Sequence, residues 1–198
     1  MTRIRLQNIS KLFMEWIVTI LIGIGLSAAS GFRVFVPLLG ISIASMAGAL
    51  ELSSDFTWIG SLPAVIAFSL ATLVEIGAYY VPWVDNALDT IASPLAVTAG
   101  IILSISVYAD MSPLLKWSLA LIAGGGVAGL VQTGTVSMRA ISSGTTGGFG
   151  NFIVASFEFL GSIVTTILAI VIPVVCFVFL LVTGVFMVRY YRRRKSTA

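Results

Sequence analysis

Histidine is absent from this chain of 198 residues, and cysteine occurs once, at Cys176. The absence of histidine excludes histidine-based catalysis and haem ligation by histidine, and no Cys/His cluster is present to bind zinc. A single cysteine also excludes an internal disulfide framework. The acidic residues form no cluster suited to a metal ion, so we expect no cofactor.

Charged residues are also scarce, because they make up 10% of the chain, against about 25% in a typical soluble domain. Hydrophobic residues make up 58%, and the mean hydropathy is +1.08. Such a composition places the chain in a lipid bilayer. The apolar runs are continuous and about twenty residues long, which favours transmembrane helices over an outer-membrane barrel. The net charge of +3 comes largely from the two ends and does not indicate nucleic-acid binding.

The chain reads as a single membrane domain over residues 13–191, with basic residues at both ends. Residues 1–12 form an amphipathic lead that carries Arg3, Arg5 and Lys11, and residues 192–198 form a basic tail. Because basic residues favour the cytoplasmic side, we expect an inner (plasma) membrane protein with both termini in the cytoplasm. That orientation requires an even number of crossings.

Seven apolar stretches follow one another, so one of them must fail to cross. The predicted stretches are 13–30, 34–50, 63–80, 94–109, 114–131, 152–172 and 173–191. The second follows a break formed by Gly31, Arg33 and Pro37 and is rich in small residues, so we expect a re-entrant hairpin there, matched by a second one at 133–151. The prediction is an all-α polytopic membrane protein with six transmembrane helices and two re-entrant hairpins. These form two inverted repeats, about 13–110 and 113–191; the alternative is seven transmembrane helices.

Four charged residues fall inside segments that should lie at membrane depth: Arg33, Glu75, Arg139 and Glu158. A charge there costs about 2.5–3.5 kcal/mol or more, so each is a candidate for function. We expect the arginines to bind an anionic group, because guanidinium matches phosphate and carboxylate. The glutamates are candidates for proton coupling or charge pairing. The alternatives are snorkelling of the arginines and purely structural Arg–Glu ties.

A segment rich in glycine and threonine, 144–151, precedes the sixth apolar stretch. Backbone N–H groups at a helix start bind anions readily, so Thr145, Thr146 and Asn151 are candidate substrate contacts. The segment lacks the Gly-Lys-Ser/Thr ending of a phosphate-binding Walker A loop. The alternative is a turn in which Asn151 caps the following helix.

Three parts of the chain resemble the domain-of-unknown-function family 4126, a set of small membrane proteins. These are residues 27–33 with Pro37; Glu75 with residues 81–86 and Asp89; and Arg139 with residues 145–151 and Glu158. The resemblance implies a membrane fold and a candidate site rather than an activity. The chain departs from the family pattern at two places. The family usually has an acidic and a basic residue where this chain has Tyr79 and Tyr80, and it commonly has a Glu-Asp pair where this chain has Glu158 and Phe159.

The favoured function is transport or flipping of a small anion or an anionic lipid head group, with a glutamate coupling a proton. An alternative is an intramembrane enzyme that acts on a lipid phosphate with Ser142 or Ser143 as nucleophile. A third is a structural or assembly subunit. The expected partners are membrane lipids and a small anionic substrate or lipid phosphate, without nucleic acid, and a homodimer is one option.

Overall fold

The structure is a computed structural model that describes residues 2–108 and 111–195; the side chains of residues 2–9, 82, 83, 85–89 and 190–195 lie outside that description. Over these residues the protein is all-helical, which confirms the predicted class. The elements are α1 (Thr2–Phe32), α2 (Phe35–Met46), the 3₁₀ helix η1 (Ser54–Gly60), α3 (Leu62–Tyr79), α4 (Pro82–Val107), α5 (Pro113–Leu119), the π-helical turn η2 (Ala120–Gly125), α6 (Gly126–Thr146), α7 (Asn151–Val171) and α8 (Pro173–Lys195).

Five helical segments are long and apolar enough to cross a membrane, as expected for a multi-pass membrane protein. They are Ser10–Phe32, Leu62–Tyr79, Thr90–Val107, Pro113–Thr146 and Asn151–Val171, and two shorter apolar helices cover Phe35–Met46 and Pro173–Arg189. Large apolar side chains lie exposed on the outside, while serine, threonine and the charged side chains of Arg33, Glu75, Arg139 and Glu158 lie buried inside. This distribution suits a lipid solvent, because polar groups are then satisfied within the protein.

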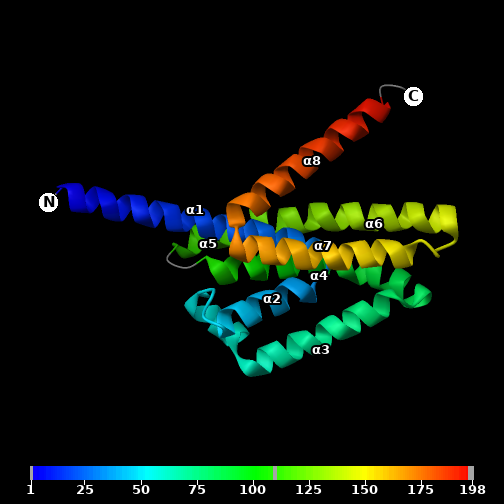
Figure 1. The fold of residues 1–198 in the computed structure, drawn as a ribbon, viewed down its shortest axis with the longest axis horizontal. Coiled ribbons are helices and arrows are strands. Elements are labelled where there is room, and N and C mark those ends of the chain that lie inside the picture. Colours follow the sequence, from blue (N-terminus) through cyan, green and yellow to red (C-terminus); the bar gives the residue numbers. More distant parts are fainter. Residues whose placement is uncertain (1, 109–110, 196–198) are drawn as a thin grey trace.

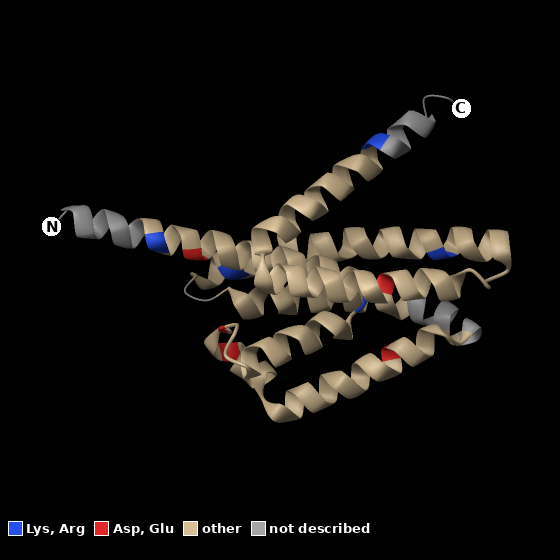
Figure 2. Ribbon diagram, viewed as in Figure 1, with Lys and Arg blue, Asp and Glu red and all other residues tan. Residues whose placement is uncertain are grey.

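The helices form a bundle of roughly parallel and antiparallel elements. Figure 1 shows α4, α6, α7 and the second half of α1 lying along one another, α2 and α3 along one side, and α8 diverging from the bundle. The α1 helix packs against α4, α6 and α7, and is therefore the central element. Figure 2 shows how few charged residues the bundle carries.

Small residues bring α1 and α4 close together. The Ser27 hydroxyl donates to the Gly100 carbonyl oxygen at 2.8 Å and lies 2.8 Å from the Ser104 hydroxyl. The Ser30 hydroxyl donates to the Ala96 carbonyl oxygen at 3.2 Å. Close backbone approach of this kind, with hydroxyls bridging between helices, is how membrane helices pack without a hydrophobic driving force.

The predicted break near Arg33 is present, since α1 ends at Phe32 and α2 begins at Phe35. Pro37 falls in the first turn of α2, the only part of a helix where a missing N–H group costs nothing. The twelve residues of α2 span about 18 Å, which is shorter than a hydrocarbon core of about 30 Å. The second apolar stretch is thus not a full-length transmembrane helix.

The α1 and α2 helices run in opposite directions along α7. Arg33, at the end of α1, donates to the Ala155 carbonyl oxygen, and α2 then returns along α7 as far as Thr166, which packs on Gly40. The chain therefore comes back toward the end of the bundle at which α1 enters (Figure 1). The first predicted span and α2 form this pair, and the predicted lead is continuous with α1. One helix covers Phe35–Met46, so the described residues show no re-entrant hairpin where one is predicted at 34–50.

The prediction of a second hairpin at 133–151 is wrong, because α6 runs unbroken to Thr146. With α5 and η2 it forms one helical run, Pro113–Thr146. The hydroxyls that suggested a polar loop instead donate to backbone carbonyl oxygens one turn earlier, as Thr133 does to Gly129 and Ser137 does to Thr133. The helix ends only where Gly147 and Gly148 adopt positive φ angles, of 64° and 93°.

The glycine triplet 124–126 allows a test of the close packing. A methyl group on Gly124 would lie 2.8 Å from the Gly100 carbonyl oxygen, whereas one on Gly126 would meet nothing within 4 Å. We expect Gly124→Ala to lower stability by about 1–3 kcal/mol, because the backbones cannot both keep their positions. Thermal unfolding in detergent measures the effect, and Gly126→Ala is the matched control. Equal melting temperatures for the two variants would contradict the packing described here.

Candidate functional site

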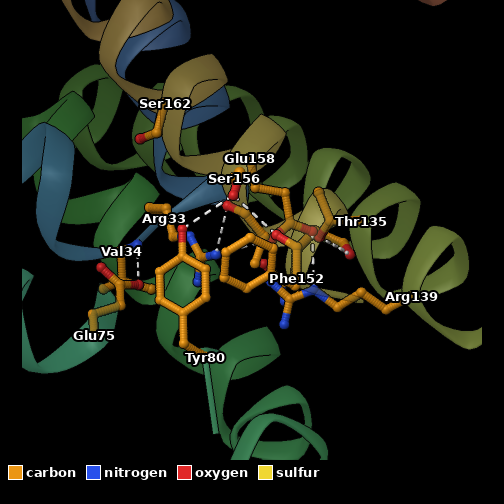
Figure 3. Close-up of polar contacts among 12 residues, drawn as sticks. Arg33, Val34, Glu75, Tyr80, Thr135, Arg139, Phe152, Ser156, Glu158 and Ser162 are labelled. Carbon is orange, nitrogen blue, oxygen red and sulfur yellow. Dashed lines mark hydrogen bonds and ion pairs between the residues drawn. The ribbon is translucent and has the colours of Figure 1, made fainter. Parts of the chain in front are cut away.

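Two arginines share one buried carboxylate in the middle of the bundle. Glu158, on α7, accepts from Arg139 Nε at 3.0 Å and also from Arg139 Nη2. Arg33 Nη2, from the end of α1, lies 3.4 Å from Glu158 Oε2. The three residues are 2%, 3% and 4% exposed for Arg33, Arg139 and Glu158. Figure 3 shows the two guanidinium groups converging on this carboxylate from different helices.

Tyr79 completes the arginine pair from the end of α3. Its ring centroid lies 3.7 Å from the Arg33 guanidinium carbon and 4.0 Å from that of Arg139. A cation over an aromatic face is attracted by the ring quadrupole, and more so where water is excluded. Tyr79 is buried, so this side chain offsets part of the cost of holding two like charges close together.

Glu75 has a different role from Glu158, although both are buried glutamates. Its Oε1 accepts from the Val34 N–H group at 2.7 Å, and its Oε2 accepts from the Phe35 N–H group at 3.0 Å. These are N–H groups at the start of α2, which no carbonyl of its own helix can satisfy. Val34 supplies no side-chain cap, so a carboxylate from α3 caps α2 and complements its dipole. Glu75 thereby holds the turn that follows Arg33.

Arg33 retains donors that no acceptor uses. Among the described residues, Nε and Nη1 of its buried guanidinium have no hydrogen-bond partner, while Nη2 donates to the Ala155 carbonyl oxygen at 3.0 Å. A buried donor without a partner costs about 1–3 kcal/mol, and more when it is charged. This side chain is therefore the least satisfied of the four predicted charges.

Two pockets flank Tyr79. One, of ≈ 360 Å³, lies between α2, α3 and α4 and is lined almost wholly by apolar side chains, with Glu75 and Tyr79 at its inner end. The other, of ≈ 450 Å³, lies between the end of α3 and the start of α7 and includes Tyr79, Phe149 and Asn151. Both volumes fall in the usual range for ligand pockets, roughly 300–1,000 Å³. Tyr79 is the residue common to both linings.

The structure brings together four of the seven predicted site residues and places the other three where α6 ends and α7 begins. Thr145 and Thr146 are exposed at the end of α6, where their hydroxyls donate to the Ile141 and Ser142 carbonyl oxygens. Asn151 is buried, donates from Nδ2 to the Ser143 hydroxyl at 2.9 Å, and lines the pocket beside Tyr79. Contact of these three residues with a substrate stays a prediction.

Sequence reasoning missed Tyr79, which was singled out only as a departure from the family pattern. One signal was available: Tyr79 follows Glu75 by four residues, so the two side chains share one face of a helix. The capping role of Glu75 had no such signal, because the N–H groups that it binds are backbone atoms 40 and 41 residues away. Within the described residues, no group of three or more Cys, Asp or Glu side chains is placed to hold a metal ion.

Comparison with known families identifies the chain. Residues 20–193 match the model of the family described as Domain of unknown function (DUF4126), so the chain belongs to this family and the predicted resemblance is confirmed. Comparisons with curated proteins and with solved structures gave no match. The family description assigns no activity, so the function has to be argued from the site itself.

The shared carboxylate should be essential for folding. Replacing Glu158 with leucine leaves two buried guanidinium groups without their common acceptor, and breaking a buried ion pair costs about 3–5 kcal/mol. We expect Glu158→Leu to lose most of its thermal stability in detergent. Glu51→Leu, at an exposed acidic position, should change stability by no more than about 0.5 kcal/mol. A Glu158→Leu protein that melts with the wild type would show that the cluster does not stabilise the bundle.

Proposed function

We propose that this protein transports or flips a small anion or an anionic lipid head group across the inner membrane, with Arg33 and Arg139 as the anion-binding groups. The observation that carries the proposal is the Arg33 guanidinium, which is buried and has two donor nitrogens, Nε and Nη1, without an acceptor in the described part of the chain. An anion bound there supplies oxygen acceptors to donors that lack them, because guanidinium N–H groups match phosphate and carboxylate oxygens.

The shortage of hydrogen-bond acceptors around Arg33 supports an anionic substrate. Two guanidinium groups share the single carboxylate of Glu158, and the Glu75 carboxylate is engaged by two backbone N–H groups. Arg33 therefore has fewer oxygen acceptors than its donors can use in the described part of the chain. A buried cation at membrane depth that lacks a full set of partners is the usual mark of a substrate or ion site.

Transport accounts for the surroundings of the cluster better than lipid-phosphate chemistry does. An enzyme would need a base beside its nucleophile, but the contact found at the Ser143 hydroxyl is the Asn151 amide, and Ser142 offers its backbone carbonyl oxygen to Thr145 and Thr146. No carboxylate contacts either serine among the described residues. The two pockets that meet at Tyr79 instead provide separate approaches to one charged cluster.

The inner-membrane location and the cytoplasmic termini stay predictions, as do the six crossings and the inverted repeats. Because α1 and α2 form a pair that returns to one end of the bundle, two cytoplasmic termini require that α8 leave the bundle without crossing. The six crossings would then include α2 in place of the predicted stretch 173–191. The divergence of α8 from α7 in Figure 1 is compatible with that arrangement.

Arg33 is the residue whose loss should abolish transport while sparing the fold. In Arg33→Met, Glu158 keeps both of its hydrogen bonds from Arg139, so the protein should still fold. We expect uptake of radiolabelled phosphate, or dithionite-detected flipping of a fluorescent anionic phospholipid, to fall by about tenfold or more in proteoliposomes, because a charged hydrogen bond is worth about 1.5–3 kcal/mol.

The matched control is Lys116→Met, which removes a cation that contacts Ser53 and lies outside the cluster. Its transport rates should equal those of the wild type. If a folded Arg33→Met protein transports both probes at the wild-type rate, the anion site is not at Arg33 and the proposal fails.

Glu75 is the better candidate for proton coupling, because Glu158 is occupied by both arginines. Protonation of Glu75 would remove the charge that caps α2 and would loosen the turn beside Arg33. We expect Glu75→Gln to keep exchange of the probe anion down its own gradient but to lose the acceleration caused by an imposed pH gradient. Asp55→Gln, at an exposed position outside the cluster, should keep both. Wild-type acceleration in Glu75→Gln would exclude this role.

A further inference from the structure

The apolar pocket beside the cluster identifies a class of substrate within the proposed function. Its lining comes from the start of α2, two residues of α4 and one face of α3, which contributes Leu70, Ala71, Val74, Glu75, Ala78 and Tyr79. Glu75 and Tyr79 are its polar members. A pocket for a small hydrophilic anion would carry more hydrogen-bonding groups along its wall.

This pocket is a groove that opens toward the lipid. Leu70 and Val74, on its outer rim, are 60% and 70% exposed, and in a bilayer such side chains on a membrane-crossing helix face the acyl chains. Ala71 and Ala78 are small, which leaves the space that the groove occupies on α3. A hydrocarbon chain can therefore enter sideways from the bilayer without passing through water.

The inner end of the groove meets the charged cluster. Tyr79 lines the groove, and the same ring lies 3.7 Å from the Arg33 guanidinium carbon. The buried Arg33 donors Nε and Nη1, which lack acceptors, are thus one side chain away from an apolar channel. On the other side, Tyr79 borders the pocket at the start of α7, which adds room for a head group.

We propose, resting on the function proposed above, that the substrate is an anionic lipid whose phosphate binds Arg33 and whose hydrocarbon chain lies in the groove between α2, α3 and α4. Charge complementarity selects the head group, and the apolar lining selects the chain. A free phosphate would use the arginines but gain nothing from the groove. Tyr79 is the boundary that the head group passes to reach the arginines.

Binding to the full-length protein in a neutral detergent tests the inference. The probes are dioleoyl phosphatidic acid, glycerol phosphate as a head group without chains, and dioleoyl phosphatidylcholine as the same chains under a zwitterionic head. We expect phosphatidic acid to bind at least about tenfold more tightly than glycerol phosphate, because burial of as few as two methylene groups is worth that much. It should also bind more tightly than phosphatidylcholine, because the choline cation offsets the charge that the Arg33 guanidinium attracts.

A bulky side chain in the groove should weaken the binding of phosphatidic acid. Ala71→Phe places a ring in the groove, and Ala67→Phe, on an exposed part of the same helix that does not line the groove, is its matched control. We expect about a tenfold loss of phosphatidic acid affinity in Ala71→Phe and no change in Ala67→Phe. Ala71→Met, with a flexible side chain, serves if Ala71→Phe does not fold.

The outcomes separate this inference from the function on which it rests. If glycerol phosphate binds as tightly as phosphatidic acid, and both lose affinity in Arg33→Met, the lipid inference is overturned while the anion function stands. Phosphatidylcholine that binds as tightly as phosphatidic acid, or unchanged binding in a folded Ala71→Phe protein, also overturns it. If neither anionic probe depends on Arg33, both proposals fail.

Discussion

The Glu158 carboxylate is the point on which the interior of this protein depends. It is the acidic side chain that contacts both buried arginines, and those arginines come from the end of α1 and the middle of α6. Without it, two like charges would face each other over one tyrosine ring in an apolar environment. A buried charge is tolerated only with a partner, so the positions of α1, α6 and α7 relative to one another are tied to this one group.

A second constraint fixes the geometry from the other side of Arg33. Pro37 lacks the N–H group that would continue the hydrogen-bond ladder of α1, and the chain breaks before it, which leaves N–H groups at membrane depth. Glu75 satisfies the N–H groups of Val34 and Phe35. The same break that leaves these backbone donors without a carbonyl partner also places Arg33 at a helix end, where its side chain reaches α7. One break in the helix therefore determines both which backbone N–H groups need Glu75 and where the Arg33 guanidinium lies.

Composition predicted the membrane helices and the four interior charges, because long apolar runs and isolated charges carry strong signals. Composition could not predict which charges meet. Arg139 and Glu158, 19 residues apart, bind each other, whereas Arg33 and Glu75, 42 residues apart, do not. The pairing depends on how helices pack, which no spacing encodes. The hairpin predicted at 133–151 is wrong for a related reason. The hydroxyl groups of this segment suit a polar loop, but in α6 they donate hydrogen bonds to carbonyl oxygens of the same helix.

The contacts of the cluster divide unequally between the two halves of the chain. Glu75 caps α2 within the first half, and Arg139 binds Glu158 within the second. The ion pair that joins the halves is Arg33 to Glu158, and at 3.4 Å it is longer than the 3.0 Å bond from Arg139 Nε. An anion at Nε and Nη1 of Arg33 would bind beside this bridging contact, which uses Nη2, and would leave the contacts within each half intact. Under the proposed transport function, substrate binding would then act on a side chain that joins the two halves through both the Glu158 carboxylate and the Ala155 carbonyl oxygen.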